Sequence, residues 1–305
     1  MSSREGKKTL PKPLGLRGFL VVIVLFFCKK VLFVKPEIKV CVYLVVCLLG
    51  SVIGDIFVVP RTYFSRKDNV FNVYFVKLCW GWTGALLAAF IAMTSYVYTC
   101  GNRQLVFLHL SRLVVATVVW YVCTSSFVTI NTLTGFCITA SVAVDTADAC
   151  RTAGHAWLGF DISGHVFMMA YCALLLAEES RAFAHWDRVG TMLLRGDNDV
   201  DERLGHLTGS ELARLREAHP RLTPYIKASF LTMALLCLLW DTMLLATTLY
   251  FHSVAQKMAA LAAAIICWFV TYRLWYKIDV SPGLPGQGAF RYVPDQSLPS
   301  RRQRL

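Results

Sequence analysis

Two histidines have the surroundings that phosphoryl-transfer chemistry requires. His165 ends the stretch Gly159-Phe-Asp-Ile-Ser-Gly-His165, at the start of an apolar run, and His252 lies in a short turn between two apolar runs. A neutral imidazole is a competent nucleophile toward phosphorus, and imidazole also donates and accepts protons near neutral pH. One histidine could therefore attack a phosphorus in line while the other protonates the leaving oxygen. Taken singly, each could instead be a polar residue at a membrane boundary.

The residues just before His165 suit the binding of an anion. Asp161, Ser163 and Gly164 stand where a helix would begin, and unpaired backbone N–H groups there favour negative charge. Glycine at position 164 would let a phosphate oxygen approach the backbone closely. Asp161 or Ser163 could also do no more than cap the helix.

Two lysines are candidate cations for a phosphate group. Lys257 follows His252 by five residues, and Lys77 lies near one end of an apolar run, where it could also snorkel toward water. A zinc site formed by the two histidines and Asp161 matches no known ligand spacing. The sequence therefore predicts neither a metal nor a cofactor.

The composition is that of a protein embedded in a membrane. Of 305 residues, 56% are hydrophobic and only 16% are charged, and the mean hydropathy is +0.52. Globular chains are about a quarter charged. The values exclude a water-soluble enzyme, a disordered chain and a small disulfide scaffold. The net charge of +12 comes mainly from basic residues at the chain ends, which indicates membrane orientation and no nucleic-acid partner.

Six apolar windows are long enough to cross a bilayer, which takes about 20 residues. They cover residues 40–59, 73–96, 113–133, 160–177, 228–250 and 254–276. The sequence thus predicts an all-α polytopic protein with six transmembrane helices and both termini on one side. A further apolar stretch, residues 18–34, is interrupted by Lys29 and Lys30, which favours an interfacial or re-entrant segment.

The distribution of basic residues fixes which side is cytosolic. With both termini cytosolic, that side holds 25 of the 31 Lys and Arg residues and the far side holds six. This agrees with the rule that basic loops stay in the cytosol. Both candidate histidines then lie at the opposite, lumenal boundary, although the topology was derived without them.

The chain divides into three predicted parts. Residues 1–39 form a basic cytosolic segment that contains the interfacial stretch, residues 40–277 form the six-span membrane domain, and residues 278–305 form a flexible cytosolic tail. The only sizeable cytosolic loop covers residues 178–227. Within it, Thr208 and Glu211 have the spacing of a capping box that opens a short amphipathic helix.

The eleven cysteines contain no CxxC pair, so none has the spacing of a structural zinc site. Most lie inside the apolar windows as small apolar residues. Cys137 and Cys150 share the loop assigned to the lumenal side, where an oxidising compartment would allow them to pair. The sequence equally allows Cys137 and Cys150 to remain free thiols.

Several stretches, in the same order along the chain, resemble motifs of one membrane protein family. They are Phe160-Asp-Ile-Ser-Gly-His165 with Phe167; Tyr250-Phe-His252 with Gln256 and Lys257; Asn69-Val-Phe-Asn-Val-Tyr-Phe-Val-Lys77 with Trp80 and Trp82; and Ser281-Pro-Gly. Over residues 40–288 the chain resembles the fat storage-inducing transmembrane (FIT) family, whose members are distantly similar to lipid phosphate phosphatases. The Asp-Ile-Ser-Gly-His form is closer to the type-two member, whereas His109-Leu-Ser-Arg-Leu and Pro282-Gly-Leu-Pro-Gly are similar to type one.

The resemblance implies a six-span protein of the endoplasmic reticulum membrane that acts in lipid droplet formation and binds diacylglycerol and triacylglycerol. It also implies an acyl-CoA diphosphatase whose site faces the lumen, with His252 as nucleophile and His165 as acid. Lipid phosphate phosphatases carry an arginine six residues before the second histidine and an aspartate four after it. This chain has Ala246 and Gln256 there, so the motif does not identify the residues that clamp phosphate and orient the histidine.

Two functions from different classes follow. The first is hydrolysis of long-chain acyl-CoA to acyl 4′-phosphopantetheine and adenosine 3′,5′-bisphosphate, with the acyl chain held in membrane lipid. The alternative is a non-enzymatic scaffold that binds triacylglycerol and diacylglycerol, in which the histidines serve structure. A transporter has less support, because no broken-helix pair or inverted repeat is visible.

Overall fold

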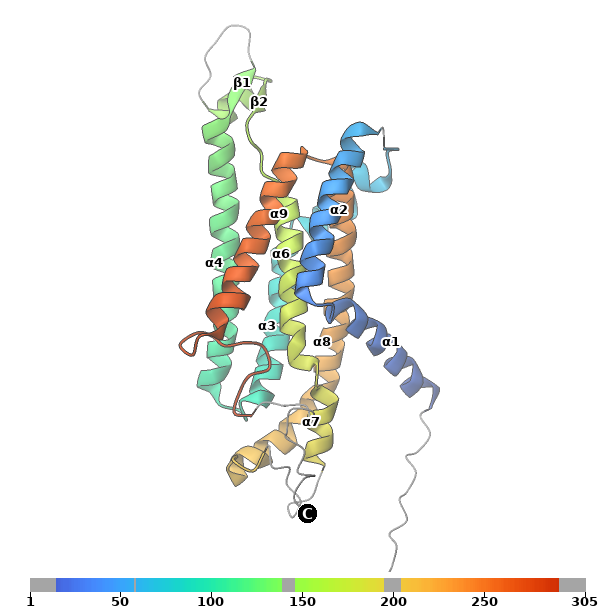
Figure 1. Cartoon of the computed structure of the whole chain (residues 1–305), viewed down its shortest axis with the longest axis vertical. Helices are drawn as coiled ribbons and strands as arrows, with labels where there is room; N and C mark the ends of the chain where they lie inside the picture. Colours follow the sequence, from blue (N-terminus) through green and yellow to red (C-terminus); the bar gives the residue numbers. More distant parts are fainter. Residues whose placement is uncertain (1–14, 58, 139–145, 195–203, 291–305) are drawn as a thin grey trace, which may run out of the picture.

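The computed structural model describes residues 15–57, 59–138, 146–194 and 204–290 (Figure 1). Parts of the predicted N-terminal segment, cytosolic loop and tail, residues 1–14, 195–203 and 291–305, lie outside the described residues. The described chain is almost entirely helical, so the predicted all-α class is confirmed. Its α-helices are α1 (Leu16–Leu32), α2 (Pro36–Ile56), α3 (Cys79–Tyr98), α4 (Arg103–Thr134), α5 (Ala147–Thr152), α6 (Gly164–Glu179), α7 (Trp186–Leu193), α8 (Gly209–Tyr250) and α9 (Val254–Trp268).

Five helical segments in the described ranges are long and apolar enough to cross a membrane. They are Pro36–Ile56, Cys79–Tyr98, Arg103–Thr134, Gly209–Tyr250 and Val254–Lys277. The last of these joins α9 to a π-helical turn, η5 (Phe269–Leu274), and a 3₁₀ turn, η6 (Trp275–Lys277). Five of the six predicted windows therefore correspond to such helices.

The remaining window, residues 160–177, corresponds to α6, which has 16 residues and lies at the centre of the bundle. It packs against α3, α8 and α9 (Figure 1), and nearly all of its side chains are buried. Its apolar residues therefore face protein on all sides, whereas the other long helices leave apolar side chains exposed on their outer faces. The helix begins at Gly164, four residues later than the predicted window, because Ser163 caps it.

The second predicted window, residues 73–96, is divided in the structure. Residues Phe71–Val76 form a separate π-helical turn, η2, and α3 begins only at Cys79. The Asn69 side chain accepts a hydrogen bond from the backbone N–H of Asn72 (2.8 Å) and so starts the extra turn. Lys77 consequently lies in the junction before α3, where it is exposed.

The predicted capping box exists at the start of α8. Thr208 accepts from the backbone N–H of Glu211, and the Glu211 carboxylate accepts from the backbone N–H of Thr208. The helix does not stay short, however. It runs for 42 residues, through Pro220 and Pro224, into the fifth apolar window, because from Leu215 onward one face of it is buried against the rest of the protein.

Both predicted terminal segments contact the bundle where they are described. α1 lies against α8 and leans away from the bundle axis with its outer apolar side chains exposed (Figure 1). Residues 278–290 were expected to belong to a flexible tail. They instead fold back onto α3 and α4, where Ala289 donates to the carbonyl of Tyr98 (2.8 Å) and Phe290 is 3% exposed. Burial of an aromatic ring accounts for this docking.

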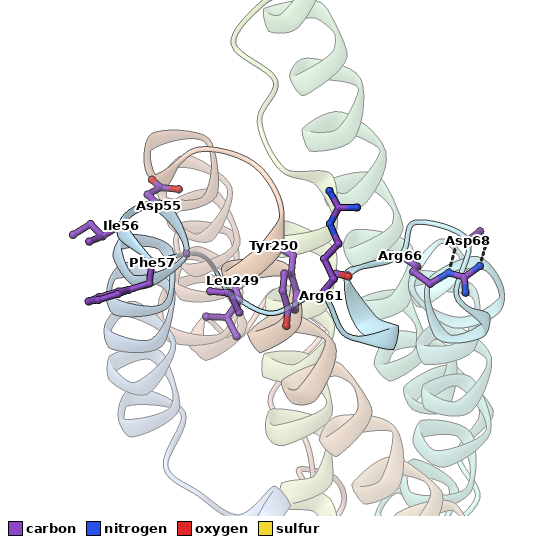
Figure 2. A pocket seen from close by; sticks show the side chains of 11 residues that line it. Asp55, Ile56, Phe57, Arg61, Arg66, Asp68, Leu249 and Tyr250 are labelled. Carbon is purple, nitrogen blue, oxygen red and sulfur yellow. Dashed lines mark hydrogen bonds and ion pairs between the residues drawn. The ribbon is translucent and has the colours of Figure 1, made fainter.

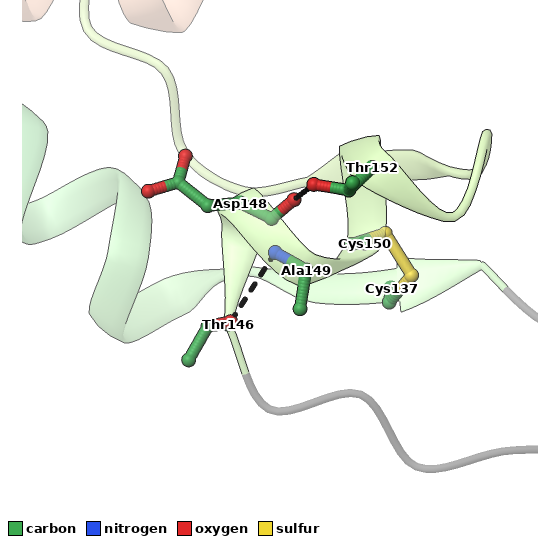
Figure 3. Close-up of a disulfide and its surroundings, with 6 residues drawn as sticks. All are labelled: Cys137, Thr146, Asp148, Ala149, Cys150 and Thr152. Atoms are coloured by element: carbon green, nitrogen blue, oxygen red, sulfur yellow. Dashed lines mark hydrogen bonds between the residues drawn. A yellow bond between two sulfur atoms is a disulfide. The ribbon is translucent and has the colours of Figure 1, made fainter.

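A small hairpin extends beyond α4 at the upper end of the bundle in Figure 1. Strands β1 (Phe136–Ile138) and β2 (Ala156–Leu158) pair antiparallel, and α5 lies between them in the chain. A disulfide joins Cys137 on β1 to Cys150 on α5 (Figure 3), and Thr146 caps α5 beside it. The structure thus contains the bond that the sequence left open.

Candidate active site

The start of α6 is fixed by its cap. The Ser163 hydroxyl accepts from the backbone N–H of Val166 (3.4 Å), and Ser163 is fully buried. This cap sets the direction of the first helical turn, on which His165 lies. His165 therefore projects from a rigid helix end and is held in place by the core beneath it.

The second histidine lies in the turn between α8 and α9. His252 has a φ of 58°, in the left-handed region that residues with a side chain rarely adopt. On the far side of the turn, Ser253 and Gln256 form a reciprocal capping box that begins α9. The tight turn and the two helix ends together determine where the imidazole points. Such a strained backbone conformation is often found at functional sites.

A backbone contact ties the two histidine segments together. The N–H of Ser163 donates to the carbonyl of Gln256 (3.4 Å). His165 and His252 both line one cavity of about 420 Å³ at this end of the bundle. The sequence predicted that they share a membrane boundary, and the structure brings them into a single site.

A carboxylate stands beside His252. Asp161 Oδ2 lies 3.8 Å from His252 Nδ1, and both residues line the cavity. A carboxylate at Nδ1 favours the tautomer that carries its proton there, which leaves Nε2 unprotonated. Asp161 does not cap α6, because Ser163 does. Nor does Gln256 orient the histidine, because its side chain accepts from the N–H of Ser253 (3.1 Å).

Positive charge reaches the cavity from the loop before α3. Lys77 and Lys67 line it, together with His165. The loop is held by two asparagines, since Asn69 donates to the carbonyl of Arg66 (2.6 Å) and Asn72 to that of Lys67 (2.7 Å). Two positively charged side chains therefore line the cavity, and positive charge there would attract an oxyanion.

Not every predicted residue reaches the cavity. Lys257 is 1% exposed, and its ammonium donates to the carbonyl of Thr248 (2.8 Å), so it supports the end of α8 from within the core. Ser163 acts through its cap. Beside Gly164, no other part of the protein lies within 4 Å of where a Cβ atom would stand, so the space next to this backbone is open. Cys137 and Cys150 belong to the hairpin and do not line the cavity.

Eight lining residues were not predicted as site residues. They are Phe64, Lys67, Asn69, Asn72, Met243, Ala246, Thr247 and Phe251. Asn69 and Asn72 do belong to the family-like stretch that ends at Lys77, so that resemblance was the available signal. Phe64 and Lys67 precede it and carry no motif. Ala246 also lines the cavity, at the position where lipid phosphate phosphatases have arginine, and the lysines of the loop provide positive charge in its place.

The arrangement contains groups of the kinds that phosphoryl transfer uses. It offers one histidine paired with a carboxylate, a second histidine nearby, and two lysines around a polar cavity. Within the described ranges, no cluster of three or more His, Cys, Asp or Glu side chains has the geometry to hold a metal ion. Fold and site together define a polytopic helical membrane protein with a paired-histidine cavity at one end of its bundle.

Comparison with known sequences gives the family. The model of the fat storage-inducing transmembrane protein family matches residues 60–141 and 136–272, and the chain belongs to this family. Similar relatives include acyl-coenzyme A diphosphatase FITM2 of Drosophila melanogaster, 38% identical over 95% of this chain and 70% of the relative. The protein of the same name from Xenopus laevis is 35% identical over 82% of this chain and 87% of its own. The human protein of that name is 36% identical over 79% of this chain and 83% of its own.

These relatives carry the type-two name, in agreement with the Asp-Ile-Ser-Gly-His form of the first motif. No solved structure matches the chain.

Proposed function

We propose that this protein is a fatty acyl-CoA diphosphatase of the endoplasmic reticulum membrane. The observation that carries the proposal is the shared cavity of His165 and His252, with Asp161 beside the second histidine. The names of the relatives supply the substrate: each is an acyl-coenzyme A diphosphatase. The products would be acyl 4′-phosphopantetheine and adenosine 3′,5′-bisphosphate, and the activity would support lipid droplet formation.

In the proposed mechanism, His252 Nε2 attacks one phosphorus of the diphosphate in line. A nitrogen–phosphorus bond forms as the bridging phosphorus–oxygen bond breaks, and His165 donates a proton to the departing phosphate oxygen. Water then attacks the phosphohistidine and gives its proton to His165, which restores both imidazoles. Asp161 holds the proton on His252 Nδ1, and Lys67 and Lys77 stabilise charge on the transferred group.

The proposed topology has six spans, with α6 as the short central one and both termini in the cytosol. The distribution of basic residues supports this topology, because the side assigned to the lumen holds six Lys and Arg residues and the other side holds 25. The exposed cations at the histidine end are Arg61, Arg66, Lys67, Lys77 and Arg151. With this end in the lumen, the acyl chain would lie in membrane lipid and the nucleotide in water. The arrangement would resemble the helical bundle of lipid phosphate phosphatases. Triacylglycerol and diacylglycerol are proposed as further lipid ligands.

The test is hydrolysis of oleoyl-CoA by the purified protein in detergent. The native protein is expected to release adenosine 3′,5′-bisphosphate, and His165→Ala and His252→Ala are each expected to lower the rate at least about 100-fold. His155→Ala is the matched control, because His155 is exposed on the same end and does not line the cavity. It should keep the native rate.

Folding of each variant is checked by size-exclusion chromatography and thermal midpoint. A native protein that is inactive yet binds triacylglycerol or diacylglycerol would replace the diphosphatase with the scaffold. Equal rates in the native protein and both histidine variants would exclude the proposed site.

A further inference from the structure

A second cavity lies at the same end of the bundle and shares a loop with the histidine cavity. It has a volume of about 650 Å³ and lies between the end of α2, the loop that follows it, and the end of α8 (Figure 2). Arg61 and Arg66 of that loop line this second cavity. Phe64 and Lys67 of the same loop line the histidine cavity. A long ligand lying across the loop would therefore occupy both cavities.

The walls of the second cavity are held in place. Gly54 on α2 packs so closely against the carbonyl of Leu249 on α8 that a Cβ atom would collide with it. The Tyr250 hydroxyl donates to the carbonyl of Pro60 (3.0 Å), and the Thr62 hydroxyl donates to the Tyr250 oxygen (3.2 Å). The loop is thus tied to the end of α8, and the cavity exists before any ligand binds.

Among the charged side chains that line this cavity, Arg61 has no ion-pair partner in the described residues. Asp68 is paired with Arg66 (3.1 Å), whose hydrogen bonds hold the pKa of Asp68 below its usual value. Asp55, at the end of α2, also lines the cavity but forms no ion pair with Arg61. Arg61 lies between Tyr250 and the Arg66–Asp68 pair in Figure 2, and no described carboxylate lies within ion-pair distance of its guanidinium. One unneutralised cation therefore lines a preformed polar cavity.

Given the proposed function, we propose that this cavity binds the 3′-phosphate on the nucleotide half of acyl-CoA, with Arg61 as its ionic partner. Acyl-CoA carries a phosphomonoester away from the diphosphate that is cleaved. A guanidinium matches such a group with paired N–H donors. The substrate would then be held at two points, its diphosphate at the histidines and its 3′-phosphate at Arg61. Arg61 would determine specificity and take no part in bond breaking.

The test compares oleoyl-CoA with 3′-dephospho-oleoyl-CoA. The native protein is expected to prefer oleoyl-CoA by about tenfold in kcat/KM, the effect of one charge-assisted hydrogen-bonded pair. Arg61→Ala should remove this preference, mainly through a higher KM for oleoyl-CoA, and leave the dephospho substrate unchanged. Arg61→Lys should restore part of it. Arg151→Ala, which removes a cation from the same end but outside the cavity, should change neither substrate.

A binding measurement separates this inference from the diphosphatase itself. Adenosine 3′,5′-bisphosphate should bind the native protein about tenfold more tightly than adenosine 5′-monophosphate, and Arg61→Ala should bind both equally. If hydrolysis is absent but this difference persists, the diphosphatase fails and the 3′-phosphate site stands. If Arg61→Ala weakens both nucleotides or both substrates equally, the site is wrong. Displacement of the bisphosphate by phosphatidic acid in mixed micelles, dependent on Arg61, would assign the cavity to a lipid phosphate.

Discussion

At His252 the peptide backbone is held in a conformation that costs about 1 kcal/mol or more for a residue with a side chain. The capping box of Ser253 and Gln256 on one side and the end of α8 on the other offset this cost. In this conformation the imidazole lines the cavity, and its Nδ1 lies 3.8 Å from Asp161 Oδ2. A histidine in a relaxed helix would point along the helix surface and would not face His165.

Asp161→Asn tests whether this carboxylate positions His252. The amide keeps the shape and loses the charge, so the favoured tautomer of His252 is lost and kcat should fall about tenfold, roughly 1.4 kcal/mol, with KM nearly unchanged. Asp161→Glu should recover part of the rate. The measurement is the pH profile of kcat for oleoyl-CoA hydrolysis. If Asp161 had only a structural role, the substitution would leave the shape of this pH profile unaltered.

Asp148→Asn is the control for that experiment, because Asp148 is exposed on α5 at the same end and does not line the cavity. It should match the native protein. An Asp161→Asn variant whose KM rises while kcat stays constant would make Asp161 a substrate-binding residue and not a positioning one.

At the scale of the elements, apolar length predicted a helix for each of the six windows, five of which are long enough to span a membrane, and the Thr208 and Glu211 spacing predicted the cap of α8. The sequence pattern could not show that α8 continues from that cap into the membrane, because an interior proline normally kinks or ends a helix and α8 contains two. Nor could it show that Lys257 is buried, since the facing carbonyl of Thr248 becomes its partner only when α8 and α9 pack. Lys257 and Lys77 have similar contexts in the sequence and opposite environments in the fold.

The end of α6 opposite the site contains a buried ion pair that gives a prediction about stability. Arg112 on α4 lies 2.7 Å from Glu179 on α6, and both side chains are at most 3% exposed. The Tyr272 hydroxyl also donates to Glu179 (2.7 Å). Glu179→Ala would leave a guanidinium buried without its counter-charge, which costs about 3 kcal/mol or more. The thermal midpoint in detergent should fall clearly.

Asp68→Ala is the matched control, because it breaks an ion pair whose two side chains are 65% and 72% exposed. Exposed pairs contribute about 1 kcal/mol or less, so its midpoint should stay close to native. Similar midpoints for the two variants would show that the Arg112 and Glu179 pair adds little to the packing of α4 against α6.

For the whole molecule, three features gather at one end of the bundle: the histidine cavity, the second cavity with Arg61, and the disulfide-linked hairpin. A disulfide persists where the surroundings are oxidising, as in the lumen of the endoplasmic reticulum. The buried Arg112 and Glu179 pair and the docked residues 278–290 lie toward the other end. The two ends of the bundle therefore differ in chemistry in the way that a fixed orientation across a membrane requires.

That orientation predicts which loops are accessible to lumenal enzymes. Ala153→Asn together with His155→Thr creates a glycosylation acceptor, Asn-Gly-Thr, in the exposed turn after α5. This variant should be glycosylated in microsomes because the proposed topology places the hairpin in the lumen. The same tripeptide inserted after Leu194, in the loop assigned to the cytosol, should remain unmodified. Removal of the glycan by an endoglycosidase should return the first variant to native mobility on a gel.

Modification of the Leu194 insertion alone would invert the topology and place both cavities in the cytosol. Modification of both variants would mean that α6 does not cross the membrane, because the hairpin and the loop after Leu194 are separated by that helix.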